Sequence, residues 1–241
     1  ELVVARSLRD VRTAFDLVNG TAPGAPTSLR IRLCLSDLHG SAENTAAQKA
    51  ANALASAGIE ITKAPLPEEL NEACRRVART VLSTAMAEGL DALGIPGTEI
   101  SPICAAAAAE GRALSGATVF AAAREIEKLS YETALLFDEV DALLLPVLSG
   151  PPPKVGHFDP TQTDPGERFD QMENMAPFAS IANVAGLPAL AFPAGMQGGL
   201  PIGLQLIGPM GSDRTLLDLA AKAGTCFDTV PFPHPIAGLI Q

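Results

Sequence analysis

The sequence predicts an α/β fold, in which a mixed β-sheet core is flanked by helices on both faces. Strand-like and helix-like segments alternate in the first third of the chain, as they do in sheets with parallel strands. An apolar run of strand length, residues 140–146, is typical of a strand that is buried on both faces. Two later strand-like segments, joined by a glycine-rich connection, indicate an antiparallel hairpin. The combination of both pairings predicts a mixed sheet.

The residue pattern of the N-terminal third predicts a helix, followed by a unit of strand, helix and strand. Apolar residues recur at helical spacing in the first helix, and alternation of apolar with polar residues marks the first strand. Gly20 and Gly58 follow the two helices, where glycine commonly ends them. The expected elements are a helix from Leu8 to Val18, a Pro/Gly loop at 21–28, a strand at 29–35, an Ala-rich helix at 43–57 and a strand around 59–61.

In the rest of the chain, the residue pattern predicts two long helices, the buried strand, a loop and a hairpin. Pro67 suits the first turn of a helix because its missing N–H has no helical partner there. The expected elements are a helix at 67–93, a helix at 118–137 with Thr118 as N-cap, the strand at 140–146, a loop at 147–167, a short helix at 177–185, strands at 189–192 and 202–207, and a last helix capped by Ser212 or Asp213 and stopped by Gly224.

Composition excludes several classes of function. The 17 Lys and Arg residues against 27 Asp and Glu give a net charge of −10, which repels nucleic acid and anionic membranes. The apolar segments are too short to cross a bilayer, so a cytoplasmic location is expected. The four cysteines are widely spaced, which favours reduced thiols over a disulfide framework or a zinc site.

No complete catalytic motif is visible in the residues themselves. The histidines, His39, His157 and His234, show no metal-ligand spacing, so neither a metal nor a cofactor is expected. The segment Ser36-Asp37-Leu38-His39 contains the residue types of a catalytic triad, but triad members meet in space rather than along one short loop. The acidic group Asp138-Glu139-Asp141 is interpreted as a solvated helix end.

Four segments closely resemble the C-terminal half of the amidase-signature family. They occur in the order and spacing of that family, and the last three are quite specific: Phe137 to Pro146, Ala182 to Ala189, Phe192 to Gly195, and Gly199 to Gly208. The segments at 4–10 and 29–62 are similar to earlier parts of the same half. The resemblance therefore covers nearly the whole chain.

The resemblance implies amide hydrolysis by a serine nucleophile, a second serine in a cis peptide and a lysine base. The serine-rich segment that carries these groups in the family is absent from this sequence, and no lysine lies in a matching context, so no catalytic residue is predicted. Residues 1–241 are expected to form the C-terminal part of a single domain, and the chain alone is expected to be inactive. The implied partners are the N-terminal portion of the enzyme, in the same or a separate chain, and a small-molecule amide; a homodimer is left open.

By the same resemblance, two loops form the wall of the substrate pocket. The residues expected to bind substrate are Val147, Leu148, Met175, Ala176, Phe178 and Ala179. Core packing is the alternative interpretation of Met175 and Phe178. Val147 replaces the threonine that commonly follows the strand proline in the family, which weakens any polar contact there. These apolar residues favour a small or aromatic amide over a strongly charged one.

Two other functions remain open. The glutamine-amidohydrolase subunit of a tRNA-dependent amidotransferase shares the same C-terminal segments. That subunit typically carries an Arg-Arg-Ile segment before the long helix and an aspartate a few residues before the Asn-x-Ala-Gly turn. This chain, however, has Ala105 to Ala109 and Gly111-Arg112-Ala113 in the first region and Ala176 in the second, so the substrate would lack its charged partners. A noncatalytic scaffold derived from the fold is the third possibility, because the nucleophile is missing from the sequence.

Overall fold

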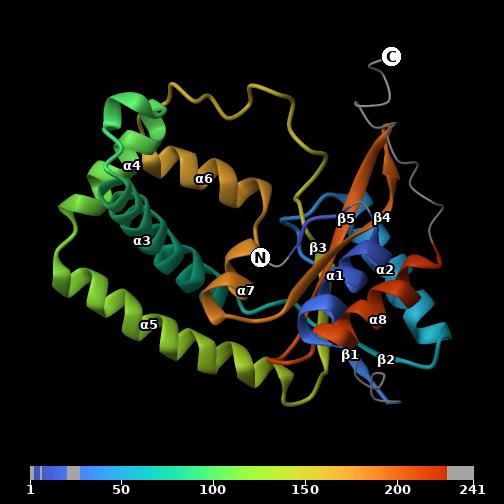
Figure 1. Ribbon diagram of the computed structural model, residues 1–241. Helices are drawn as coiled ribbons and strands as arrows, with labels where there is room; N and C mark the ends of the chain where they lie inside the picture. The colour runs from blue at the N-terminus through green and yellow to red at the C-terminus, as the bar shows by residue number, and fades with distance from the viewer. Residues whose placement is uncertain (1–2, 6, 21–27, 227–241) are drawn as a thin grey trace.

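A mixed five-stranded sheet forms the centre of the computed structural model, which describes residues 3–5, 7–20 and 28–226 (Figure 1). The strand order is β2-β1-β3-β5-β4. The strands are β1 (Arg30–Leu33), β2 (Glu60–Lys63), β3 (Ala142–Pro146), β4 (Ala189–Gln197) and β5 (Leu200–Ile207). β1 pairs parallel with both β2 and β3, whereas β5 pairs antiparallel with both β3 and β4. The predicted mixed sheet and its hairpin are confirmed.

The predicted buried strand, β3, is the central one. All five of its residues are buried, because it has a strand neighbour on each side and helices on each face. The pairing with β1 starts at Asp141, whose N–H donates to the Arg30 oxygen at 2.7 Å. The Asp141 carboxylate also accepts from the Arg30 N–H at 2.7 Å. The interpretation of Asp141 as part of a solvated helix end is therefore wrong, because its side chain continues the strand pairing.

One face of the sheet is covered by α2 (Ser41–Ser56) and α8 (Asp213–Gly224), with α1 (Leu8–Asn19) outside α8. The side chains of Leu144 and Leu206 point to this face and belong to its core. α2 presents a stripe of small buried residues to the sheet, Ala46, Ala47, Ala50 and Ala51, which lets helix and sheet pack closely. Helix α1 is fixed by charged pairs, Arg12 with Asp218 and Arg214 with Asp16, each at 2.6 Å.

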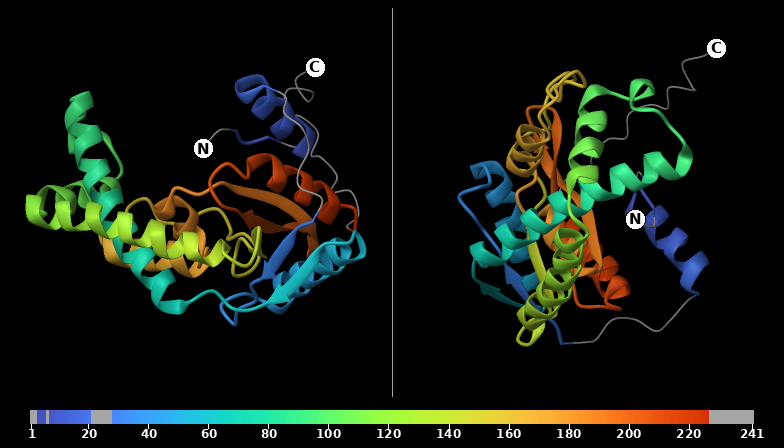
Figure 2. Two further views of the ribbon diagram at one scale, coloured as in Figure 1. Left: turned by 90° about the horizontal axis from the view of Figure 1, so that it is seen from below. Right: turned by 90° about the vertical axis from the view of Figure 1, so that its left-hand side faces the viewer.

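The opposite face carries α3 (Glu68–Leu93), α5 (Gly116–Ala134) and α7 (Ala179–Ala185) (Figure 2). Leu143 and Leu145 alternate with Leu144 along β3 and therefore point to this second core. They are joined there by Leu129 of α5 and Ile181 of α7, which are fully buried. Helices on both faces, as predicted, bury the whole apolar run.

Two helices that the sequence patterns did not predict complete the chain. α4 (Pro102–Ala113) packs along the C-terminal half of α3, and together with the start of α5 they extend away from the sheet as an arm (Figure 2). α6 (Pro165–Met175) runs beside this arm and shortens the predicted loop at 147–167. Short 3-10 turns, Gly97–Glu99 and Leu135–Phe137, precede α4 and follow α5.

Several predicted boundaries change. Thr118 is not the N-cap of α5, because Ser115 caps this helix and its hydroxyl accepts from the Thr118 N–H at 3.1 Å. β4 runs to Gln197, five residues beyond its predicted end at Phe192, with a register shift between Pro193 and Met196. Most of the predicted loop at 21–28 lies outside the described residues. No helix among the described residues is long and apolar enough to cross a membrane.

Candidate functional site

Three loops meet at the carboxyl edge of the parallel strands β1 and β3. One follows β1, one follows β3, and the third links α6 to α7. The Gly40 N–H donates to the Ser149 oxygen at 2.7 Å, and the Ser149 N–H donates to the Met175 oxygen at 2.8 Å. Ser149 thus joins all three loops through its backbone. In α/β sheets, this edge is where ligands commonly bind.

Two of these loops hold the six residues predicted to bind substrate. Val147 and Leu148 directly follow β3 and are half-buried, and the Val147 N–H donates to the Gly203 oxygen at 3.0 Å. Met175 and Ala176, also half-buried, end α6, and the Ser149–Met175 bond brings them beside the first pair. The structure therefore gathers both predicted groups in one region.

Phe178 and Ala179 differ in exposure. Phe178 is only 6% exposed and belongs to the core beneath α7, whereas Ala179 is exposed at the start of that helix. In this chain, Phe178 is therefore packed in the core, as the alternative interpretation proposed. Contact of any of the six residues with a substrate stays a prediction.

His39 is a residue of this region to which sequence reasoning assigned no role. Its side chain is 5% exposed, and its ring centroid lies 5.3 Å from that of Phe178, with the ring planes tilted by 51°. Neither ring nitrogen finds a hydrogen-bond partner among the described residues. Burial lowers the pKa of His39 to about 4, so the imidazole is neutral at pH 7.

A serine, aspartate and histidine triad does not form in the loop that carries His39. The Ser36 hydroxyl accepts from the Leu38 N–H at 3.2 Å and so forms a local turn. The Asn44 side-chain amide instead holds the loop, donating to the Ser36 oxygen at 2.9 Å and to the His39 oxygen at 3.4 Å. These bonds fix the conformation of the loop at both ends.

Gly40 gives this loop its close contacts with the neighbouring segments. A Cβ atom at Gly40 would lie 2.3 Å from a carboxylate oxygen of Glu43 and 3.2 Å from the Ser149 oxygen. Glu43 itself is only 4% exposed and lies in the first turn of α2, where the helix dipole favours a negative charge. Any side chain at Gly40 would displace either the carboxylate or the loop that follows β3.

Two arginines of α3 position the third loop. Arg75 donates to the Pro177 oxygen, with Nη2 at 2.8 Å and Nε at 3.2 Å. Arg79 binds the Glu173 carboxylate through two nitrogens, at 2.7 and 2.6 Å, and Asp170 at 2.6 Å. Hydrogen bonds to Glu173 are the largest cause of a raised pKa of Arg79. Both arginines therefore anchor the end of α6 and the link to α7.

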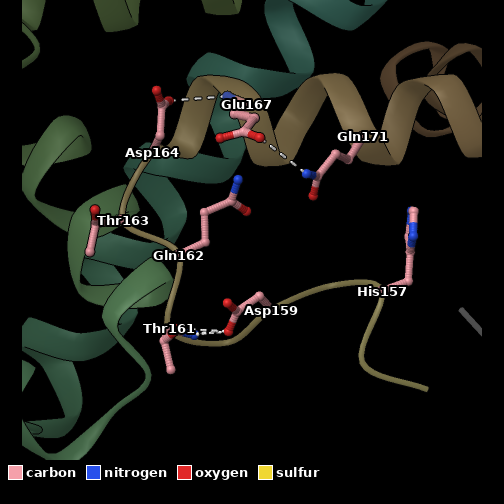
Figure 3. A pocket seen from close by; sticks show the side chains of 8 residues that line it. All are labelled: His157, Asp159, Thr161, Gln162, Thr163, Asp164, Glu167 and Gln171. Atoms are coloured by element: carbon pink, nitrogen blue, oxygen red, sulfur yellow. Dashed lines mark hydrogen bonds between the residues drawn. The ribbon is translucent and has the colours of Figure 1, made fainter. Parts of the chain in front are cut away.

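A separate polar pocket of about 440 Å³ lies between α6 and the loop before it (Figure 3). Its lining residues are His157, Asp159, Thr161, Gln162, Thr163, Asp164, Glu167 and Gln171. Its aspartates already have structural partners: Asp159 accepts from the N–H and hydroxyl of Thr161 at 2.8 and 2.7 Å, and Asp164 caps α6 by accepting from the Glu167 N–H at 3.0 Å. None of the six predicted residues lines this pocket.

The described part of the chain forms no metal centre and no disulfide. Across residues 3–5, 7–20 and 28–226, no group of three or more His, Cys, Asp and Glu side chains is arranged to hold a metal ion. All four cysteines are free thiols, of which Cys34 and Cys74 are buried and Cys104 and Cys226 are partly exposed.

The comparison with known protein families decides the family. A family model described as Amidase matches residues 26–217, which is most of the chain. The chain belongs to the amidase family. The resemblance to the amidase-signature family is therefore confirmed, and the three joined loops belong to an amidase fold.

Individual relatives agree with this assignment. One subunit of the glutamyl-tRNA(Gln) amidotransferase of Thermus thermophilus is 43% identical over 93 residues, covering 39% of this chain and 18% of that protein. The 2-amino-5-chloromuconic acid deaminase of Comamonas testosteroni is 26% identical over 233 residues, covering 90% and 49%. The structure of 6-aminohexanoate cyclic dimer hydrolase complexed with substrate has a TM-score of 0.78 at 23% identity, covering 94% and 54%.

The relatives are longer than this chain. The chain spans about half the length of the two relatives that it matches over most of its own length, 49% and 54%. At 23% identity, the structural likeness establishes the fold and not the substrate.

Proposed function

We propose that this chain is the C-terminal part of a single amidase domain and forms the substrate-pocket wall of an amide-hydrolysing enzyme. The supporting observation is the junction at Ser149, whose backbone joins the loop after β1, the loop after β3 and the end of α6. Two of these loops carry all six residues that the family resemblance assigned to the pocket wall. Membership of the amidase family supplies the class of reaction.

In the proposed reaction, the serine nucleophile, the second serine and the lysine base come from a portion outside this sequence. That portion, in the same or a separate chain, is the principal proposed partner. The part played by this chain is to bind and orient the amide. Apolar Val147, Leu148 and Met175 favour linear or aryl carboxamides, because no charged side chain among them would pair with a charged substrate.

The test is an ammonia-release assay on the protein that contains these residues, together with any chain that copurifies with it. The substrates are an aliphatic amide, an aryl amide, a dicarboxylate monoamide and glutamine. We expect the aliphatic and aryl amides to be hydrolysed. Preferred turnover of the dicarboxylate monoamide would contradict the proposed apolar pocket, and no turnover of any substrate would contradict the proposed activity and favour a noncatalytic scaffold.

Variants test the position of the wall. Met175→Ala enlarges the proposed pocket and is expected to raise KM for the aryl amide by about tenfold, since removal of a methionine side chain from a binding surface loses about 1 to 2 kcal/mol of contact. Phe120→Ala is the matched control, because Phe120 is 68% exposed on α5, in the arm. An equal change in both variants would argue against this pocket.

A glutamine-amidohydrolase subunit is the second candidate. The 43% identity to the Thermus thermophilus amidotransferase subunit over 93 residues favours it. Ala105 to Ala109 and Ala176 speak against it, because they provide no charge to pair with the α-ammonium or α-carboxylate of glutamine. The segment Gly111-Arg112-Ala113 of the same region carries one charge, and Arg112 already pairs with Asp91 at 2.6 Å. Efficient glutamine hydrolysis in the same assay would make this candidate the better one.

A further inference from the structure

His39 is a buried titratable side chain that the proposed chemistry does not use. It follows β1 at the carboxyl edge of the sheet and is 95% buried, since only 5% of it is exposed. Its hydrogen-bonding capacity is unused, because both ring nitrogens lack a partner among the described residues. Its ring contact is with Phe178, at 5.3 Å between centroids. The His39 side chain is therefore held by its ring contact with Phe178 and by the backbone of its loop, and not by hydrogen bonds of the ring nitrogens.

That loop is held from several sides. The Asn44 amide donates to the Ser36 and His39 oxygens, and the Gly40 N–H donates to the Ser149 oxygen at 2.7 Å. A Cβ atom at Gly40 would lie 2.3 Å from the Glu43 carboxylate and 3.2 Å from the Ser149 oxygen, so this part of the loop is closely packed. The imidazole is also packed on nearly all sides, since only 5% of His39 is exposed, and such packing limits its rotamers. The imidazole therefore offers the Phe178 ring a contact at a fixed place.

The ring that packs on it is at the start of α7, directly after the proposed pocket wall. Phe178 follows Ala176 and Pro177, and the Pro177 oxygen is held by Arg75 at 2.8 Å. Arg75 fixes the backbone of this link, whereas the His39 imidazole supplies a lateral contact to the Phe178 ring. The tilted geometry of this contact is one that aromatic pairs favour.

We propose that His39 is a positioning residue that acts through Phe178 and sets the place of the wall segment from Met175 to Ala179. The inference rests on the proposed function, because it gives the wall its role in binding an amide. The contact is between the two rings, whose centroids lie 5.3 Å apart, and neither nitrogen of His39 has a hydrogen-bond partner among the described residues. A residue that offers a flat ring is therefore required at position 39, whereas a residue that offers only polar atoms or only apolar bulk is not sufficient.

Three substitutions separate these roles. His39→Phe keeps a flat ring and removes the nitrogens, His39→Gln keeps polar atoms without a ring, and His39→Leu keeps apolar volume alone. We expect His39→Phe to retain the wild-type KM for the aryl amide, and the other two to raise it about fivefold with kcat nearly unchanged. The proposal is overturned if His39→Gln retains KM while His39→Phe does not, or if all three variants behave like wild type.

Coupling to Phe178 is measured with a double variant. His39→Leu is combined with Phe178→Leu, which preserves an apolar core but removes the ring. We expect His39→Leu to have no further effect on KM in the Phe178→Leu background. Additive effects of the two substitutions would show that His39 does not act through Phe178. Phe120→Leu on the exposed face of α5 is the matched control background.

A readout that needs no activity separates this inference from the proposed function. The protein is labelled with 4-fluorophenylalanine, and the ¹⁹F signal of Phe178 is assigned from its loss in Phe178→Leu. His39→Leu and His39→Gln are expected to shift or broaden this signal, and His39→Phe to leave it as one sharp line. An unchanged Phe178 signal in all variants contradicts the positioning role, even in an active enzyme. A changed signal in a protein that hydrolyses no amide contradicts the proposed function alone.

Discussion

Gly111 of α4 lies directly against the backbone of Ser83 in α3. A Cβ atom at Gly111 would be 2.0 Å from the Ser83 oxygen and 2.5 Å from its carbonyl carbon. Neither atom is the end of a flexible side chain, so a substitution would have to separate the helices. The cluster of buried apolar residues in this part of the arm is small, consisting of Ala87, Leu90 and Ala108 among the described residues. The contact between α3 and α4 therefore depends on the missing side chain of one glycine.

Gly111→Ala is expected to lower the free energy of unfolding by about 2 kcal/mol or more, because the added methyl group overpacks a backbone contact. Urea unfolding, followed by the loss of helical circular dichroism, measures this change. Gly89→Ala is the control, since Gly89 lies inside α3 and a Cβ atom there meets nothing within 4 Å. That variant should be stabilised by about 0.5 to 1 kcal/mol through the higher helix propensity of alanine. A similar effect of both substitutions would contradict the close contact.

Arg79→Met is expected to loosen α6 from α3. The bidentate pair with Glu173 and the bond to Asp170 would both be lost, with a cost of about 1 kcal/mol after allowance for solvent screening, because the arginine side chain is 35% exposed. Faster limited proteolysis near α6, compared with wild type, measures the loosening. Glu173→Gln should show a larger effect than Asp170→Asn, because the side chain of Glu173 is 18% exposed and that of Asp170 is 63% exposed. The reverse order would show that burial does not set the strength of this anchor.

His39 makes stability depend on pH. Its pKa is lowered from 6.5 to about 4 in the folded chain, so the unfolded chain binds the proton more strongly between these values. The stabilising effect of the neutral imidazole is fully present above pH 6.5 and is lost as the pH falls toward 4. We expect wild type to lose about 2 kcal/mol more than His39→Phe between pH 7 and pH 5. Urea unfolding of both proteins at each pH gives this difference.

The comparison with His39→Phe removes the contributions of other titrating groups near the loop. Asp37 and Glu43 lie on the same segment and are present in both proteins, as is His157. A wild-type protein whose stability follows that of His39→Phe over this pH range would show that the imidazole is not buried in its neutral form.

The thiols are expected to react in two groups. Burial raises the pKa of Cys34 to about 12 and that of Cys74 to about 11, so neither forms the reactive thiolate at pH 8. Cys104 and Cys226 are partly exposed and should be labelled first by a maleimide in the folded protein. A Cys104→Ser, Cys226→Ser double variant should remain unlabelled until urea is added. Labelled Cys34 or Cys74 in a folded sample, detected by peptide mass spectrometry, would contradict this order.

The elements that could be predicted from the sequence are those whose own residues carry the signal. The apolar run at 140–146 predicted β3 because a central strand is buried on both faces. Helix α4 was missed because it meets α3 through Ala108 and Gly111, which give almost no apolar periodicity. Helix α6 was missed because ion pairs, chiefly Arg79 with Glu173, hold it in place. A single sequence does not show which distant charges will pair.

The candidate site shows the same division. The loops after β3 and before α7 were found through family resemblance, and the structure joins them through Ser149 and Met175. The loop after β1 was not assigned to the site. In the sequence, His39 of this loop is an isolated histidine, which does not indicate a site. Its ring partner Phe178 is far away along the chain. Only the crossover that makes β1 and β3 neighbours brings these two rings together.

The central position of β3 also has a consequence for how the chain folds. Arg30 and Asp141, which begin the pairing of β1 with β3, are 111 residues apart. Before β3 is available, β1 and β2 form only a short parallel pair, which is too small to be stable by itself. The first two strands therefore gain their stability only after the central strand has been synthesised and has docked between β1 and β5. Such dependence on distant contacts makes folding slow, and it leaves the apolar face of α2 exposed to other chains while the ribosome completes the second half.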